Sequence, residues 1–597
     1  MKSKHAERML SGERTCIGQI TKSAMFSLFS RSSRSDPASV DARFQAIYTK
    51  EWAWRQAQHL ESDEDEVGIP SYLPRVDDKT QQERLAYWRD VIKQLDNIDP
   101  KTLSAKEQVN YGVYREQIEV FVAQQEFKDY EKPLNADTAF WSNQASIARQ
   151  TFSKHDDYTN YIAQLKDVPR YFSEQMDNMR SGLKRGFTPP RITLIGRDSS
   201  IVSVVEAKTP EDTIYYEPFK SILGSIPAQE QANLRSKGLE VIRESVLPTY
   251  QKLLTFFRDE YFPNTREKLD AESLPNGRAY YLAKIREFTT EPLKAETIHK
   301  IGVDEIARIR AEMADTIKES GFKGDFNSFL DFLRTDPQFY AKTPEQLLKE
   351  AAWIAKEFDG VSDKYFGHLP RRRFAIKPVP DDEAPFYTSG RGGPGVYLVN
   401  TYDLPSRALY SLPALTLHEA APGHAFQMPL VLEQKDNPPF RNAYISAYGE
   451  GWALYCEYLG KEMGMYHTPY DTFGMLSYQA WRAARLVVDT GIHSLGWTRE
   501  QAQKYLHDNT ALSAHEIETE VDRYIAWPGQ SLSYYLGELA ILKCRKKAEE
   551  ALGDKFNIRA FHDAVLQTGS VPLPLLEKHI DEFINNGGKG PYPNEEH

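Results

Sequence analysis

The sequence predicts a mainly α-helical fold, and three observations support that class. Apolar residues recur at helical spacing, interrupted by charged ones, in six long segments. Strand-like patterns are confined to two short segments, Thr188–Ile195 and the residues after Gly395. A chain of 597 residues with 41% hydrophobic content can bury a large core, and this length indicates more than one lobe.

The predicted helices follow one another along the chain. Helical spacing covers Asp41–His59, Thr80–Ile98, Lys106–Asp129, Tyr158–Lys184, Ala228–Phe262 and Ala295–Gly321. A charged linker at Asn264–Leu274 separates two predicted helical lobes, residues 39–270 and residues 271–597. Residues 1–38 are rich in Arg, Lys and Ser, and we expect them to form a disordered tail.

Composition argues against several classes of protein. The formal net charge of −11 disfavours a nucleic-acid-binding protein, because no broad basic field would attract phosphates. Three cysteines are too few for a disulfide framework. No stretch approaches the roughly eighteen consecutive apolar residues that span a bilayer, so we expect no membrane span. The lack of a secretory apolar core predicts a cytoplasmic protein, and a non-standard leader would instead make it periplasmic or secreted. The oligomeric state is left open.

The most informative segment of the chain holds His418, Glu419 and His424. In the HExxH motif of zinc peptidases the histidines are four residues apart, so that both reach one Zn²⁺ while the adjacent Glu acts as general base. Here the histidines are six residues apart, and on a straight helix roughly 240° of rotation would separate their side chains. Either this segment is not a metal site, or the helix breaks between the histidines.

Two residues between the histidines favour a broken helix. Pro422 cannot donate to the carbonyl of His418 and its ring clashes there, while Gly423 can take backbone angles that are closed to other residues. A widened turn over Ala421–Gly423 would bring His424 back beside His418. The alternative is that the Pro-Gly pair simply marks the end of a helix.

A third candidate ligand, Glu450, lies 26 residues after His424 in a predicted helix. Gly449 and Gly451 would let this helix pack closely against the motif. Glu457, seven residues further on, returns to the face of Glu450 and could accept a hydrogen bond from a ligating histidine. The alternative for Glu450 is a solvated surface carboxylate, although its apolar and aromatic neighbours are typical of a buried segment.

These blocks together resemble the domain-of-unknown-function 885 family. The resemblance is carried by His418-Glu-Ala-Ala-Pro-Gly-His, Glu450-Gly-Trp-Ala-Leu-Tyr, Trp481–His493 and Arg523–Gln530, and it runs from roughly Asp41 to Pro591. That family is similar to helical zinc peptidases of the angiotensin-converting-enzyme and oligopeptidase type. The resemblance implies a two-lobed helical architecture like that of zinc peptidases, with a small β element lining a deep cleft and one Zn²⁺ per chain. Many relatives carry a second His where this chain has Ala425, which makes His424 the only candidate ligand there.

A Gly/Pro-rich stretch precedes the histidine motif. Gly390–Gly395 lacks the lysine and hydroxyl of a P-loop, so we do not expect nucleotide binding. Alternation after Gly395 predicts a short strand, and an edge strand beside a zinc site can hold an extended peptide by main-chain hydrogen bonds. This pattern assigns Asn400 and Tyr402 to substrate binding.

The helix predicted at Ser477–Leu495 gathers polar side chains on one side. These side chains are Gln479, Arg482, Arg485, Asp489 and His493. One interpretation is a structural network that pairs Arg482 with Asp489 and with carboxylates next to the metal ligands, in which Asp489 and His493 contact the ligands and not the metal. The other is that Arg482 or Arg485 binds a substrate carboxylate through a bidentate contact.

The last block supplies candidate groups for the reaction itself. A zinc hydrolase needs a donor that faces the oxyanion formed during attack on a carbonyl. Tyr524 is the first candidate and Tyr534 the second, with Arg523 beside them to bind substrate charge, and simple packing is the alternative for each tyrosine. The helix that carries Tyr534 is predicted to begin at Pro528, since proline favours a first helical position.

The predicted reaction is hydrolysis of an amide bond. His418, His424 and Glu450 would hold Zn²⁺ and activate a water molecule, whose proton Glu419 would take and pass to the leaving amine. We expect short peptides as substrates, because a deep cleft admits extended chains and excludes folded proteins. The alternatives are a zinc amidase acting on a non-peptide acyl compound, or a non-catalytic metal-binding protein. Co²⁺ or Mn²⁺ would also suit this ligand set.

Overall fold

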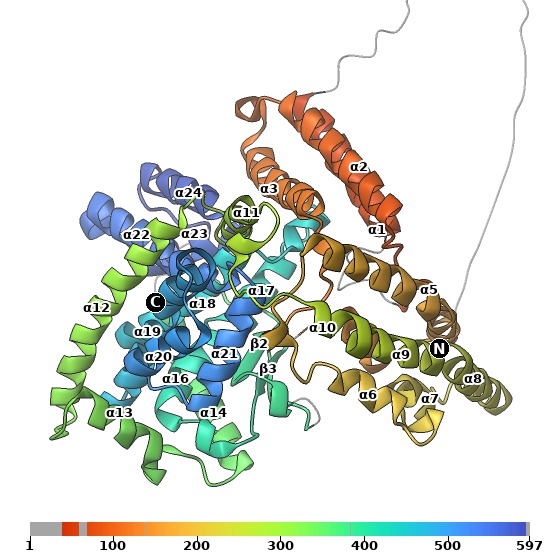
Figure 1. Cartoon of the computed structure of the whole chain (residues 1–597). Coiled ribbons are helices and arrows are strands. Elements are labelled where there is room, and N and C mark those ends of the chain that lie inside the picture. Colours follow the sequence, from red (N-terminus) through yellow and green to blue (C-terminus); the bar gives the residue numbers. More distant parts are fainter. Residues whose placement is uncertain (1–38, 59–67, 137, 382–383, 593–597) are drawn as a thin grey trace, which may run out of the picture.

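The computed structural model describes residues 39–58, 68–136, 138–381 and 384–592, so the predicted tail at residues 1–38 lies outside the described residues. The described chain is mainly helical with one small sheet, as the sequence predicts (Figure 1). The helices before residue 270 are α1 (Val40–Ala57), α2 (Asp78–Asp96), α3 (Ala105–Phe127), α4 (Phe140–Ser146), α5 (His155–Arg185), α6 (Ser199–Val205), α7 (Glu217–Lys220), α8 (Ala228–Val241), α9 (Leu247–Thr255) and α10 (Phe262–Asn264).

The part of the chain after residue 270 contains the sheet and the remaining helices. The strands are β1 (Ala375–Pro378), β2 (Gly390–Gly393) and β3 (Val396–Val399). The helices are α11 (Gly277–Thr289), α12 (Ala295–Glu319), α13 (Phe326–Thr335), α14 (Pro344–Asp359), α15 (Ser362–Tyr365), α16 (Leu412–Glu419), α17 (His424–Leu432), α18 (Ser446–Met463), α19 (Pro469–Leu495), α20 (Arg499–Asn509), α21 (Ala514–Ala526), α22 (Ser533–Leu552), α23 (Ile558–Gln567) and α24 (Leu573–Asn585). No helix in the described ranges is long and apolar enough to cross a membrane.

All six helical segments predicted from apolar spacing are present, with ends that differ by a few residues. The segment from α8 to α10 is continuous but contains π-helical turns at Ile242–Val246 and Phe256–Tyr261. Pro248 and Pro263 follow these turns. A proline ring clashes with the carbonyl four residues earlier, and the backbone relieves the clash by widening the preceding turn.

Two local predictions are wrong. The strand predicted at Thr188–Ile195 is instead a 3-10 turn at Arg191–Leu194, because Pro189 and Pro190 cannot donate hydrogen bonds to a strand ladder. The helix predicted to begin at Pro528 begins later. The φ of Gly529 is 83°, in the left-handed region, so a helix that started at Pro528 could not continue through it. A 3-10 turn at Gln530–Leu532 follows, and α22 begins at Ser533.

The buried apolar side chains form two main cores. The larger core joins α1–α3 to the helices from α11 onward. Phe440, in the segment before α18, connects these parts, since its ring centroid lies 5.2 Å from that of Tyr48 and 5.0 Å from that of Tyr114. The buried members of the smaller core all lie between Ile69 and Tyr261. Helices α1–α3 therefore pack with the C-terminal half, and the lobe boundary near residue 270 stays a prediction.

The small sheet has the strand order β1-β3-β2. Strand β3 pairs in parallel with β1 and antiparallel with β2, with Gly392 opposite Tyr397. The strand predicted after Gly395 is therefore confirmed as β3, but its predicted edge position is wrong, because β3 is the central strand and pairs on both sides. Helices α16 and α17 both pack against β2, which brings the sheet to the segment that contains the candidate ligands.

Candidate metal centre

The helix break predicted between the two histidines is confirmed. Helix α16 ends at Glu419, Ala420 leaves the helical region with φ −94° and ψ −102°, and α17 begins at His424. The Ala421–Pro422 peptide bond is cis. Gly423 is required by a close approach of the backbone, because a Cβ at this position would lie 1.8 Å from the carbonyl oxygen of His418. The break thus folds the start of α17 back onto the end of α16.

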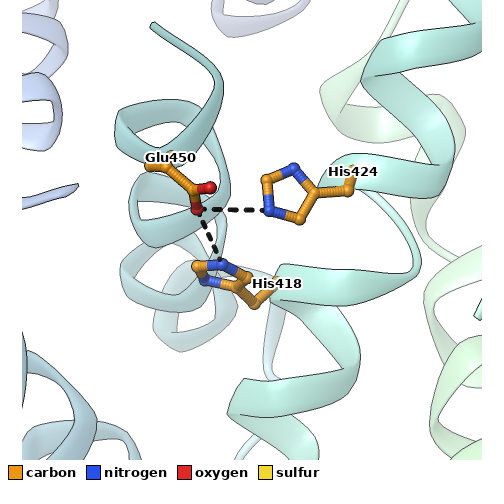
Figure 2. A group of neighbouring side chains, drawn as sticks. All are labelled: His418, His424 and Glu450. Carbon is orange, nitrogen blue, oxygen red and sulfur yellow. Dashed lines mark ion pairs between the residues drawn. The ribbon is translucent and has the colours of Figure 1, made fainter. Parts of the chain in front are cut away.

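This geometry brings His418, His424 and Glu450 together (Figure 2). Glu450 Oε2 lies 3.5 Å from His418 Nε2 and 3.3 Å from His424 Nε2. One ligand atom from each residue lies within 4.8 Å of the others, and both histidines are buried. Two imidazoles and a carboxylate that converge on one point could hold a metal ion.

Close backbone packing fixes Glu450 on α18. A Cβ at Gly451 would lie 2.4 Å from the carbonyl carbon of Gly537 on α22, and a Cβ at Gly449 would lie 2.3 Å from the ring of Tyr444. The glycines do allow close packing, but their neighbours are Tyr444 and α22, so the prediction that they pack against the motif helix was wrong. A side chain at Gly451 would clash with the backbone of α22 and force α18 to shift.

Tyr444 is a site residue that sequence reasoning missed. Its hydroxyl donates to Glu450 Oε1 at 2.9 Å, opposite the oxygen that faces the histidines. Desolvation of its hydroxyl and the nearby Glu450 carboxylate hold the pKa of Tyr444 well above its usual value, although part of the ring is exposed, so the hydroxyl remains a donor. Tyr444 precedes α18 in an irregular segment and belongs to no motif. The one available signal was Gly449, whose small size leaves room for the ring.

Glu457 makes the contact that the sequence predicts. Its Oε1 lies 2.7 Å from His418 Nδ1, and Arg482 Nη2 lies 3.3 Å from the same oxygen. A proton on Nδ1 leaves Nε2 free to bind a metal, which is the usual second contact of a ligating histidine. Trp452 further fixes the site, because its indole N–H donates to the carbonyl oxygen of Pro422 at 2.8 Å.

The charges at the centre are strongly coupled. Burial alone would lower the pKa of His418, but hydrogen bonds to Glu450 and Glu457 outweigh it and raise that pKa to about 9. Burial would likewise raise the pKa of Glu450, yet His424 and His418 hold it well below its usual range. Glu450 is therefore an anion that attracts positive charge at the point where the two Nε2 atoms converge. A divalent cation bound at this point would be attracted by the Glu450 carboxylate in the same way.

Glu419 lies at the end of α16, against the sheet. Its Oε2 accepts a hydrogen bond from the backbone N–H of Gly392 at 2.6 Å. Only glycine fits at residue 392, because a Cβ there would lie 1.7 Å from the carbonyl oxygen of Glu419. The glycine-rich stretch singled out in the sequence thus meets the candidate general base through β2.

Asn400 and Tyr402 lie on the segment that follows β3. The Asn400 amide is buried, donates to the carbonyl oxygens of Ala384, Tyr387 and Thr388, and accepts from the backbone N–H of Tyr402. These bonds use Asn400 to shape its own loop, whereas the Tyr402 side chain is half exposed. The substrate contacts predicted for both residues have no support from this geometry.

The two candidate tyrosines differ in their surroundings. The Tyr524 hydroxyl donates to Glu520 and accepts from Trp481 and Arg485, all within 2.9 Å, so its hydrogen-bonding capacity is used inside the protein. The ring of Tyr534 lies 6.4 Å from the ring of His418 and nearly parallel to it. This arrangement reverses the predicted order and makes Tyr534 the better candidate for an oxyanion donor.

The three predicted substrate-binding arginines form ion pairs with two carboxylates of the protein. Arg485 and Arg523 both bind Glu520, with N···O distances of 2.9 and 2.8 Å, while Arg482 binds Glu457. Burial would raise the pKa of Glu520, but Arg523 and Arg485 lower it to about 2. The guanidinium of Arg485 also lies 4.4 Å from the ring centroid of Tyr534. Arg485 and Arg523 thus form a cationic cluster beside Tyr534, and their substrate role stays a prediction.

Asp489 and His493 form hydrogen bonds with groups other than the metal ligands, and Arg482 binds Glu457 instead of the predicted Asp489. Asp489 accepts from Tyr281, from the Ser531 hydroxyl and from the backbone N–H of Gly529. His493 contacts the backbone of Ala271 and of Tyr524, and burial lowers its pKa to about 3, so the ring is neutral. These hydrogen bonds connect α19 to neighbouring segments. They give no support to the predicted role of Asp489 and His493 in holding the metal ligands.

Comparison with known proteins identifies a matching family and similar solved structures. A family model described as "Bacterial protein of unknown function (DUF885)" matches residues 63–580. The structure described as the "putative lipoprotein from Colwellia psychrerythraea" is 25% identical with a TM-score of 0.83, covering 92% of this chain and 100% of that one. A "putative lipoprotein of unknown function from Shewanella oneidensis" is 18% identical with a TM-score of 0.64, covering 91% and 99%, a likeness that shows the fold alone. No curated protein matches.

Proposed function

This chain belongs to the DUF885 family, and we propose that it is a zinc-dependent hydrolase that cleaves amide bonds, most suitably in short peptides. The observation that carries the proposal is the convergence of His418, His424 and Glu450 across a helix break, with Glu419 next to the first histidine. A purely structural zinc site normally closes its coordination with four protein ligands. Three ligands beside an acidic residue favour a catalytic site.

The donor set suits zinc. Two imidazole nitrogens and one carboxylate oxygen are ligands that Zn²⁺ prefers, and the bond from His418 to Glu457 orients the first ring for binding. His424 Nδ1 is buried without a hydrogen-bond partner among the described residues, which leaves its Nε2 as the nitrogen that faces Glu450. A zinc ion held there would supply Lewis-acid activation of water and of the scissile carbonyl.

The side chains around the ligands suit the remaining steps of amide hydrolysis. Glu419 takes a proton from the attacking water as its oxygen bonds to the carbonyl carbon, and gives that proton to the amine nitrogen as the C–N bond breaks. Burial and the nearby Glu450 carboxylate raise the pKa of Tyr534, although Arg523 and Arg485 act in the opposite direction, so its hydroxyl stays protonated and can donate to the carbonyl oxygen as negative charge develops. Gly392 holds the Glu419 carboxylate through its N–H.

The architecture supports this choice of substrate by analogy. A two-lobed helical body with a cleft at the metal, like that of helical zinc peptidases, would admit an extended peptide beside β2 and exclude folded proteins. This part of the proposal rests on fold analogy and on the short sheet next to Glu419. A non-peptide acyl amide would meet the same chemistry, and a panel of short peptides tested against acyl amides and esters separates the two.

Substitution of Glu419 tests whether the site is catalytic. The Glu419→Gln protein should bind one zinc per chain, as measured by metal analysis, and should lose at least about 10²-fold in kcat because the general base is gone. Glu83→Gln, which changes an exposed carboxylate on α2, is the matched control and should keep full activity. Full activity in Glu419→Gln would remove Glu419 from the mechanism, and a metal-free wild-type protein would point to a non-metal function.

We also propose a location in the cell envelope. The two solved structures quoted above are each described as a "putative lipoprotein". This description favours the alternative to the cytoplasmic location that the sequence predicted. Fractionation of cells that produce the full chain tests the proposal, and recovery of the protein only with cytoplasmic markers would contradict it.

A further inference from the structure

A cavity of about 550 Å³ lies between the N-terminal helices and the candidate metal centre. Helix α1 contributes Trp52 to its wall, α3 contributes Val120 and Phe121, and α11 contributes Phe288. The volume falls within the range of roughly 300–1,000 Å³ that is typical of small-molecule sites. The lining residues lie between Trp52 and Ser446, so segments far apart in the sequence together create the cavity.

Three structural connections join this cavity to the metal centre. Met428 and Leu432 line the cavity from α17 and lie four and eight residues after His424, so they share one helix face with the first residue of that helix. Tyr444 lines the cavity and donates to Glu450. Pro394, in the turn after β2, lines it from the strand whose Gly392 binds Glu419. The cavity wall therefore contacts the candidate ligand Glu450 directly through Tyr444, and its other two connections run along the backbone from His424 and from Gly392.

The walls of the cavity are mainly apolar and aromatic. Two carboxylates also line it, Glu116 and Glu287, and each shares its cation with another carboxylate. Glu116 accepts from Arg286 at 3.2 Å, and Arg286 also binds Glu119; Glu287 binds Lys284 at 2.7 Å, and Lys284 also binds Asp129. These carboxylates would repel an anionic occupant, and the mainly apolar walls would not replace the hydration of a charged group. The chemistry favours an uncharged apolar group.

We propose that this cavity is a subsite for a bulky apolar side chain of the substrate, such as Phe or Leu, on a residue next to the scissile bond. The proposal rests on the proposed hydrolase function and adds a substrate class to it. Aromatic walls from Trp52, Phe121 and Phe288 would bury the side chain, while the peptide backbone beside it reaches the metal centre. Removing apolar surface from water supplies the binding energy.

The test compares peptides that differ at a single position. Short peptides carrying Ala, Leu or Phe at each position in turn are offered to the zinc-loaded wild-type protein and to Val120→Trp, which fills the cavity. The wild-type protein should prefer Phe or Leu over Ala by about tenfold or more in kcat/KM at one position adjacent to the cleaved bond. Val120→Trp should abolish this preference, so that the Ala, Leu and Phe peptides are cleaved with similar kcat/KM.

Two further variants keep the test decisive. Ala105→Trp places the same side chain at an exposed position of α3 outside the cavity, and it should retain the wild-type preference. Met428→Ala, which removes apolar wall instead of filling space, should lower kcat/KM for the Phe peptide alone, and it serves if Val120→Trp does not fold. Thermal unfolding and zinc content establish that each variant is intact.

The outcomes separate this inference from the function on which it rests. A preference that is lost in Val120→Trp and kept in Ala105→Trp supports the subsite. Equal cleavage of Ala, Leu and Phe peptides by the wild-type protein, or a preference unchanged in Val120→Trp and Met428→Ala, would overturn the subsite and leave the hydrolase function standing. Failure to cleave any peptide would overturn the proposed peptidase function and the subsite with it.

Discussion

Replacing Glu457 by glutamine would remove the negative charge behind His418 while keeping the shape of the side chain. Glu457 is fully buried and its Oε1 serves two cationic partners, His418 Nδ1 at 2.7 Å and Arg482 Nη2 at 3.3 Å. The amide oxygen of glutamine could still accept from His418. The variant therefore isolates the charge from the hydrogen bond.

Two effects of different size follow from this geometry. Loss of the partner behind a ligating histidine typically costs about 10- to 100-fold in metal affinity, or about 1.4 to 2.7 kcal/mol. Arg482, which is also buried, would lose its anion, and leaving one member of a buried ion pair uncompensated typically costs about 3–5 kcal/mol. We expect the lower end, about 3 kcal/mol of unfolding free energy, because the amide oxygen still accepts a hydrogen bond.

Zinc competition titration and chemical unfolding measure these two effects. Glu538→Gln is the matched control, since Glu538 is an equally buried carboxyl, on α22, that accepts from Gln479 at 2.9 Å. Burial raises the pKa of Glu538 to about 8, so the carboxyl is largely protonated at pH 7. Glu538→Gln should therefore leave both the zinc affinity and the unfolding free energy nearly unchanged. Unchanged zinc affinity in Glu457→Gln would refute the supporting role of this carboxylate, and equal losses in both variants would attribute the effect to general disruption.

Three further predictions concern other parts of the molecule. Gly423→Ala should lower zinc affinity by at least about tenfold in a competition titration, because its Cβ would lie 1.8 Å from the His418 carbonyl oxygen and force the break open; unchanged affinity would contradict this account. Tyr534→Phe should lower kcat by about 10²-fold with little change in unfolding free energy, whereas Tyr524→Phe should cost about 1–3 kcal/mol of stability, and the reverse pattern would restore Tyr524 as the donor. The free energy of unfolding of the wild-type protein minus that of Glu538→Gln should fall as pH rises from 4.5 to about 8. The reason is that Glu538 binds its proton more tightly in the folded protein than in the unfolded chain. A difference that stays flat or rises would exclude a raised pKa of Glu538.

The sequence was sufficient for features that depend on local chemistry. Periodic apolar spacing predicted the helices, and Pro422 predicted the break because a proline cannot continue the hydrogen bonding of a helix. Glu450 and Glu457 are seven residues apart and so share a helix face. This spacing predicted that Glu450 could be a ligand while Glu457 contacted the Nδ1 atom of His418.

The sequence was insufficient where a role depends on which partner a side chain finds in space. The hydroxyl of Tyr524 is occupied by groups from α19 and α21, which no local pattern identifies. Asn400 had the right residue type for substrate binding, but its amide satisfies three carbonyls of its own loop. Tyr444 reaches Glu450 from an irregular segment without any periodicity. Tertiary contacts decide each of these cases.

The packing of α1–α3 against the C-terminal half has a consequence for how the chain folds during synthesis. The core between Ile69 and Tyr261 can close once its own residues have left the ribosome. Aromatic side chains of α1–α3, such as Tyr114, must wait for Phe440 and for the helices beyond it. At roughly 5–20 residues per second, that delay lasts tens of seconds. The first helices to be made are thus among the last to be buried, and during that interval their apolar faces are what a chaperone would bind.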